Sequence, residues 1–167
     1  MVSLLAILFV EQPRKLMLKQ IRLSMLLLAF IGNFTYTASA RANFQGKLRV
    51  EVEGFRNTQG QACVSIFASS QGFPSNSDRV LKRQCSKITD TSLTFTFNNL
   101  KAGSYAVAVI HDQNQDQILN RNNLGMPIEG FGFSRNPEVR TSPPAFQDAA
   151  FMLAGPNTVI RIHLKYL

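Results

Sequence analysis

The sequence predicts an all-β fold, a single antiparallel β-sandwich of six to seven short strands. Apolar and polar residues alternate in short runs such as Gly46–Gly54, which is the pattern of half-buried strands. Turn-forming residues separate these runs, and short strands at regular spacing are typical of a sandwich. No stretch of the chain after Ala40 has the periodicity of a convincing amphipathic helix.

The predicted strands follow one another with polar connections, except for one long loop over residues 111–144. Ser104–Ile110 has small and branched residues on both faces, so we expect a central strand that is covered on both sides. Phe146–Leu153 is predicted as a strand or an edge segment. The remaining predicted strands are Gly46–Gly54, Gln61–Ser69, Arg79–Thr89, Ser92–Phe97 and Thr158–Tyr166.

The first forty residues have the organisation of a secretory signal peptide. Basic residues precede the apolar stretch Leu23–Ile31, and Ala38–Ala40 supplies the small residues of a cleavage site. We therefore predict a signal region over residues 1–40, cleavage after Ala40, and a β-sandwich domain over residues 41–167. The protein is expected to be exported, to the periplasm or the extracellular space.

Composition narrows the class of partner. The chain after Ala40 keeps fourteen of the 18 basic residues and nine of the ten acidic ones, a net charge of +5. The charges are scattered, and only Arg79–Lys87 resembles a cluster; a solvated strand face and a surface for an acidic partner both fit it. No recognisable nucleic-acid module is present, so nucleic acid is not expected. No apolar run in the mature chain reaches the roughly 20 residues of a membrane-spanning helix, so no transmembrane anchor is expected there.

Two cysteines, Cys63 and Cys85, lie in the mature chain. An even number of cysteines in an exported protein favours a disulfide. Two buried thiols on neighbouring strands are the alternative.

The first half of the long loop predicts a cation site. Oxygen-bearing side chains at alternate positions can surround Ca²⁺, which takes six to eight oxygen ligands. In a twelve-residue calcium loop, however, Gln117 replaces the usual glycine and Asn123 the usual glutamate. A loop whose Asp and Asn side chains bond its own backbone is the alternative. The candidate calcium ligands are Asp112, Asn114, Asp116, Ile118 (through its carbonyl) and Asn120.

The second half of the loop holds the candidate binding residues Glu129, Phe131, Phe133 and Ser134. Phe131 and Phe133 are two apart, so an extended chain shows both on one side, either as a stacking platform for sugars or peptides or as anchors to the core. A hydrolase using His111, Asp112 and Glu129, with Ser134 as nucleophile, is a further hypothesis. No nucleophile-elbow sequence supports it.

Several segments in order resemble a known bacterial exported family, domain of unknown function 2141: NNLKAGSYAVAVIHDQNQD, LGMPIEGFGFS and PPAFQDAAF. The family usually has glycine and a further aspartate where this chain has Gln117 and Asn120. FNNLKAGSYAV also resembles an element of transthyretin-like and carboxypeptidase-regulatory-like sandwiches. The resemblance implies a prealbumin-like or immunoglobulin-like Greek-key fold. It implies no activity, because the family has none assigned and a fold alone transfers none.

The leading functional hypothesis is an exported, non-enzymatic binding or accessory sandwich of the cell envelope. Its functional surface is the loop 111–144, since a loop of this length in a compact domain is usually functional or disordered. The expected partner is an envelope protein, a peptide or a glycan, and the only cofactor considered is Ca²⁺ as a staple for the loop. The alternative is a purely structural accessory domain without a ligand.

Overall fold

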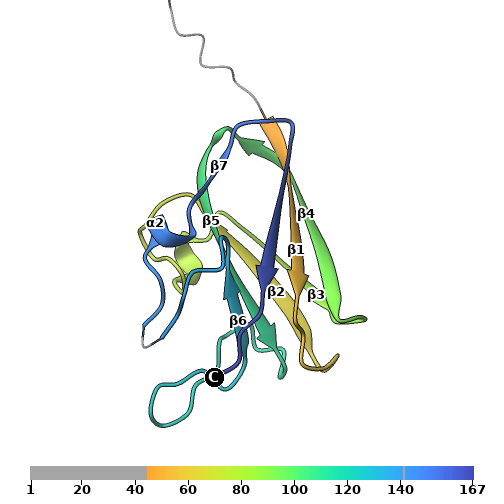
Figure 1. Ribbon diagram of the computed structural model, residues 1–167, viewed down its shortest axis with the longest axis vertical. Coiled ribbons are helices and arrows are strands. Elements are labelled where there is room, and N and C mark those ends of the chain that lie inside the picture. Colours follow the sequence, from red (N-terminus) through yellow and green to blue (C-terminus); the bar gives the residue numbers. More distant parts are fainter. Residues whose placement is uncertain (1–44, 141) are drawn as a thin grey trace, which may run out of the picture. The chain divides into compact units, whose positions relative to one another are not determined.

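The computed structural model describes residues 45–140 and 142–167, which form two β-sheets packed face to face (Figure 1). The predicted signal region and its cleavage site lie outside the described residues. The described residues belong to one compact unit. The predicted all-β sandwich is confirmed.

One sheet has three strands in the order β4 (Ser92–Lys101), β1 (Gln45–Glu53) and β8 (Asn157–His163). β1 is antiparallel to β4 and parallel to β8, the one parallel pair among the described strands. The chain reaches β8 from the other sheet and enters at the end where β1 begins, since the N–H of Lys47 donates to the carbonyl of Pro156 at 2.9 Å. This crossover explains why β8 runs alongside β1 in the same direction.

The second sheet has five antiparallel strands arranged around β5 (Gly103–Asp112). β2 pairs along one edge of β5, and β3 pairs with β2. β6 and β7 share the other edge, with β7 at the start of β5 and β6 at its end. The bounds of these strands are β2 Gln61–Phe67, β3 Lys82–Lys87, β6 Gly130–Phe133 and β7 Phe151–Leu153.

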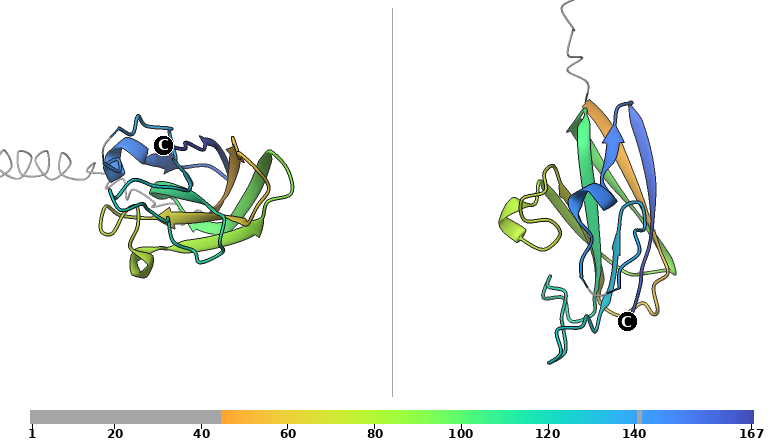
Figure 2. Two further views of the ribbon diagram at one scale, coloured as in Figure 1. Left: turned by 90° about the horizontal axis from the view of Figure 1, so that it is seen from below. Right: turned by 60° about the vertical axis from the view of Figure 1, so that its left-hand side comes forward.

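The five-stranded sheet is buried on both faces. One face packs on the three-stranded sheet through side chains such as Val64, Ile66 and Val107. The opposite face, here called the outer face, carries a second apolar cluster that includes Phe67, Ala108 and Phe133. The segments that contain η1 (Ser77–Arg79) and α2 (Phe146–Ala149) lie over the outer face (Figure 2). The predicted two-sided burial of the central strand is therefore confirmed.

Two segments differ from the sequence prediction. The predicted loop 111–144 is divided by β6, which raises the strand count to eight in the described chain. β6 was predicted as loop because glycine is not a typical strand residue. The glycines are needed here, since a Cβ on Gly130 would lie 2.5 Å from the Tyr166 ring and one on Gly132 would lie 2.7 Å from Ile162 Cγ2. Glycine thus allows β6 to approach the C-terminal residues, which pair with it through Phe131 and Lys165. The predicted strand 146–153 is the short helix α2 followed by β7.

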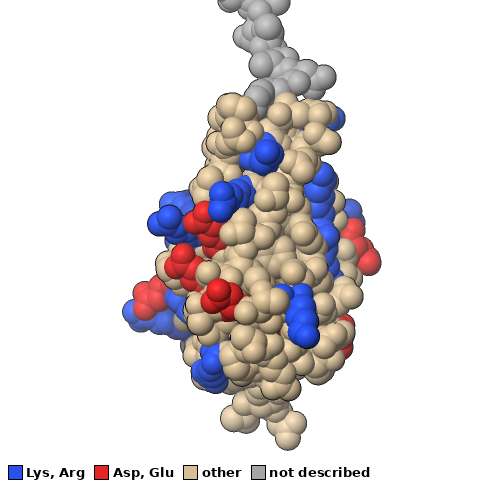
Figure 3. Space-filling view, turned by 90° about the vertical axis from the view of Figure 1, so that its right-hand side faces the viewer, with Lys and Arg blue, Asp and Glu red and all other residues tan. Residues whose placement is uncertain are grey.

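Basic and acidic side chains are mixed on the face shown in Figure 3 rather than gathered by sign. Glu51 pairs with Arg161 on the neighbouring strand β8 at 2.8 Å and with Arg49 on its own strand at 3.4 Å. Among the described residues, no helix has both the length and the apolar character needed to span a membrane.

The predicted disulfide is confirmed: Cys63 and Cys85 are directly opposite on β2 and β3 and are bonded. The bond closes a loop with a sequence separation of 22 residues. Replacing both cysteines by serine is expected to lower the free energy of unfolding by about 3 kcal/mol, because the unfolded chain regains the entropy of that loop. Urea denaturation of the variant and the oxidised wild type measures this. Equal midpoints and slopes would contradict it.

Candidate functional site

The end of β5 places a histidine in the interior of the sandwich. His111 is fully buried, with the rings of Phe55 and Tyr166 edge-on to it. Its Nε2 lies 2.8 Å from the backbone oxygen of Gln59, which only accepts, so this nitrogen carries a proton. Its Nδ1 accepts from the Tyr166 hydroxyl at 2.6 Å, and that hydroxyl accepts the N–H of Arg56 at 3.0 Å. Burial raises the pKa of Tyr166, against the opposing effect of Arg56, so the phenol keeps its proton. Through these two hydrogen bonds His111 joins the segment that contains Gln59 to the C-terminal segment that contains Tyr166.

The next residue, Asp112, is a fully buried carboxylate that holds the start of the following loop. Its Oδ2 accepts from the side-chain amide of Gln61 at 2.8 Å and from the N–H of Gln117 at 2.9 Å. Its Oδ1 accepts the N–H of Asp116 at 3.1 Å. Gln117 has a φ of +65°, so the chain makes a sharp turn at the position where a calcium loop uses glycine.

Asp116 organises the outer part of the same loop. Its Oδ2 accepts from the side-chain amides of Asn114 at 2.8 Å and Asn120 at 3.0 Å. Its Oδ1 accepts the N–H of Ile118 at 2.8 Å. These three donors, with Asn120 contributing most, lower the pKa of Asp116. The structure therefore brings the predicted cation ligands together, and they bond to one another.

These hydrogen bonds decide how a cation would fit. Of the side-chain oxygens predicted to bind calcium, only Oδ1 of Asn120 lacks a hydrogen-bond partner. Within residues 45–140 and 142–167, no three His, Cys, Asp or Glu side chains are grouped so as to hold a metal ion. A calcium ion would have to displace backbone and amide donors from both aspartates. The arrangement has the form of a self-bonded loop, and calcium binding stays a prediction.

Glu129 closes the loop from its far end. Its carboxylate is 4% exposed. Oε1 accepts the N–H of Gln113 at 2.8 Å, and Oε2 accepts the N–H of Asn120 at 3.0 Å. One buried carboxylate thus fixes both ends of the segment 113–120, although the two ends are far from Glu129 in the sequence.

The other predicted binding residues are also buried. The Ser134 hydroxyl accepts the N–H of Val107 at 2.9 Å and donates to the carbonyl of Ala149. Phe131 and Phe133 are 3% and 7% exposed and have ring centroids 5.9 Å apart. Both rings lie on the outer face of β6. The binding role assigned to these side chains stays a prediction.

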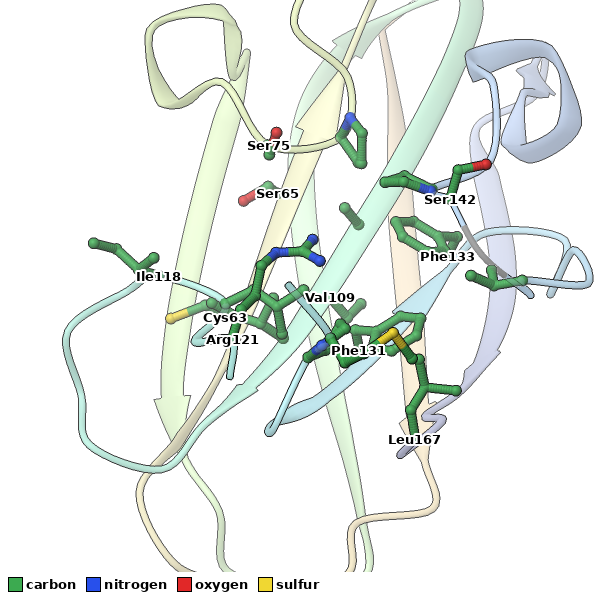
Figure 4. Close-up of a pocket in the computed structure, with 18 of the residues that line it drawn as sticks. Cys63, Ser65, Ser75, Val109, Ile118, Arg121, Phe131, Phe133, Ser142 and Leu167 are labelled. Carbon is green, nitrogen blue, oxygen red and sulfur yellow. The ribbon is translucent and has the colours of Figure 1, made fainter. Parts of the chain in front are cut away.

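A cavity of about 580 Å³ lies against the outer face of the five-stranded sheet. Its floor includes Ser65 of β2, Ala108 of β5 and Phe131 and Phe133 of β6 (Figure 4). The segments 117–127 and 74–77, with residues 139–140 and 142–143, form its walls. We call this space the loop-side cavity. None of the described side chains that line it is acidic, and Arg83, Arg121 and Arg140 are among the lining residues.

The loop predicted as the functional surface supplies part of the cavity lining, but the cavity itself was not predicted. Phe131 and Phe133 were predicted binding residues and line it, whereas His111, Asp112, Glu129 and Ser134 do not. The missed residues include Ser65, Arg83 and Arg121, which come from separate parts of the chain. The alternation of Ala106, Ala108 and Ile110 along β5 signalled a second covered face, but no local pattern tells which loops cover it.

The sequence comparison shows the family. Residues 50–161 match the model of a family described as uncharacterized protein conserved in bacteria, DUF2141, and the chain belongs to it. No curated protein and no solved structure matches the chain. The resemblance to transthyretin-like sandwiches stays a prediction.

The double anchorage by Glu129 gives one prediction. In Glu129→Gln, the side chain keeps one acceptor oxygen, and its amide group faces the N–H of Gln113 or Asn120. One buried N–H then lacks an acceptor, which is expected to lower the free energy of unfolding by about 1–3 kcal/mol. Urea denaturation measures the change, with the exposed Glu138→Gln as the matched control. The role is contradicted if the two variants unfold at the same urea concentration.

The lowered pKa of Asp116 predicts a dependence on acid. A carboxylate with a lower pKa in the folded chain contributes stability that is complete above its unfolded pKa, about 3.9. This contribution is lost as the pH falls through the folded value. Wild type should therefore lose stability relative to Asp116→Asn below about pH 4. Thermal unfolding of both proteins between pH 7 and pH 2.5 checks this, and a constant difference in melting temperature would refute it.

Proposed function

We propose that this protein is an exported, non-enzymatic binding module whose ligand occupies the loop-side cavity. The observation that carries the proposal is the cavity itself. Its volume of about 580 Å³ is within the range of about 300–1,000 Å³ found for small-molecule sites. Its floor belongs to the rigid strands β2, β5 and β6, and one wall belongs to the long loop.

The hydrogen bonds of the loop support binding rather than catalysis. Both ring nitrogens of His111 are engaged, and the Ser134 hydroxyl is held between two backbone groups. A general base and a nucleophile must reach a substrate, and these two groups are fully buried outside the cavity. The hydrolase hypothesis therefore has less support than the binding hypothesis.

Two observations support export of the protein. Residues 1–40 have the pattern of a signal peptide, and Cys63 and Cys85 form a disulfide, a bond that persists in oxidising compartments. The module is thus proposed to act in the periplasm or outside the cell. Calcium, if bound at Asp112 and Asp116, serves as a staple for the cavity wall.

Blocking the cavity tests the proposal. Ala108 lies on the floor, so Ala108→Phe fills the space, while Ala102→Phe adds the same ring at an exposed turn. The protein from residue 41 is titrated with the neutral apolar fluorophore N-phenyl-1-naphthylamine. We expect a saturable fluorescence increase in wild type and Ala102→Phe and its loss in Ala108→Phe.

Folding of each variant is checked by circular dichroism and thermal melting. If Ala108→Phe does not fold, the half-buried Ile110→Phe on the same floor replaces it. Absence of saturable binding in wild type would favour the alternative of a purely structural accessory domain.

A further inference from the structure

The loop-side cavity combines a largely apolar floor with arginine side chains and has no acidic side chain among its described lining. We infer that its ligand is an amphipathic anion, a molecule with an apolar chain and a carboxylate or phosphate head. This inference rests on the proposed function and adds the chemical class of the ligand. It rests on the charge of the arginines and on the apolar character of the floor and the rim.

Arg121 is the residue that brings charge into the cavity. It lies on the segment between β5 and β6, and its guanidinium extends toward the centre of the cavity (Figure 4). One of its nitrogens, Nη1, donates to the backbone oxygen of Gly125 at 2.8 Å. That bond holds the side chain in place and leaves further N–H donors, since a guanidinium has five.

Arg83 is held in a similar way from β3. Its Nε donates to the hydroxyl of Ser65 at 2.9 Å, and Ser65 is itself 6% exposed on the cavity floor. Among the described residues, neither Arg83 nor Arg121 pairs with a carboxylate, whereas Arg140 pairs with Glu138 at 2.8 Å. These two guanidinium groups, both on exposed residues, thus form no ion pair with a carboxylate among the described residues, and charge-assisted bonds from arginine to carboxylate or phosphate are strong.

The remainder of the cavity accepts an apolar chain. Ala108, Phe131 and Phe133 form the apolar part of the floor, beside Ser65. The rim continues this character, because Ile118 and Met126 line the cavity and are 63% and 38% exposed. A purely ionic ligand would leave this apolar surface in water, and a purely apolar ligand would offer the guanidinium groups no anionic partner.

A pair of ligands that differ only in the head group tests the inference. Decanoate and decanol have the same chain length, and each is used to displace the bound fluorophore N-phenyl-1-naphthylamine. Decanoate is expected to displace it at a concentration at least about tenfold lower than decanol. Arg121→Gln and Arg83→Gln should reduce this preference, and the exposed Arg49→Gln on β1 should leave it unchanged. The ratio is the readout because a loosened loop would weaken both ligands alike.

Each outcome has a separate meaning. If the fluorophore does not bind, the proposed function fails. If it binds but decanol competes as well as decanoate, the anion inference fails and the binding module remains. Flotation with phosphatidylglycerol and phosphatidylcholine vesicles separates a free ligand from a lipid head group in a membrane. Binding to the anionic vesicles without displacement by decanoate would overturn the cavity inference.

Discussion

Burial of β5 on both faces is the constraint on which the rest of the structure depends. One face of Tyr105–Val109 completes the core between the two sheets. The other face is apolar as well and is covered by loops and short helices. Apolar burial of about 25 cal/mol per Å² favours any arrangement that covers this outer face. The segments around η1, α2 and the long loop supply that cover, and the space that they leave unfilled is the loop-side cavity.

The polar residues at the end of β5 fix the position of the loop that follows it. Burying a carboxylate is costly unless hydrogen bonds compensate, and Asp112 accepts three and Glu129 two. These bonds use the residues that a sequence pattern associates with metal binding or catalysis. Their effect is to give a long connection a single conformation, which places Arg121 and Ile118 at the cavity. The shape of the cavity therefore depends on these backbone N–H groups.

Much of the fold and part of the site were accessible from local patterns. Alternation in Gly46–Gly54 predicted β1, and the two-sided apolar run Ser104–Ile110 predicted the central strand. The pair Cys63 and Cys85 predicted the disulfide. β6 was not predicted, because its glycines are explained by close contact with Tyr166 and Ile162, which are distant from β6 in the sequence. The lining of the cavity was only half predicted, since Ser65 gave no binding signal and Arg83 belonged to the basic cluster Arg79–Lys87, for which a solvated face fitted equally well.

By itself the sequence determined the class of fold, the central strand and the cysteine pairing, because each depends on local periodicity or residue type. Only the tertiary structure decided how those residues are used. It turned Asp112, Glu129 and His111 inward as anchors and gathered Arg83, Arg121 and Phe133 around one cavity. The physical reason is that strand pairing and burial bring together side chains from distant positions. Which groups form hydrogen bonds or ion pairs is decided only by these tertiary contacts.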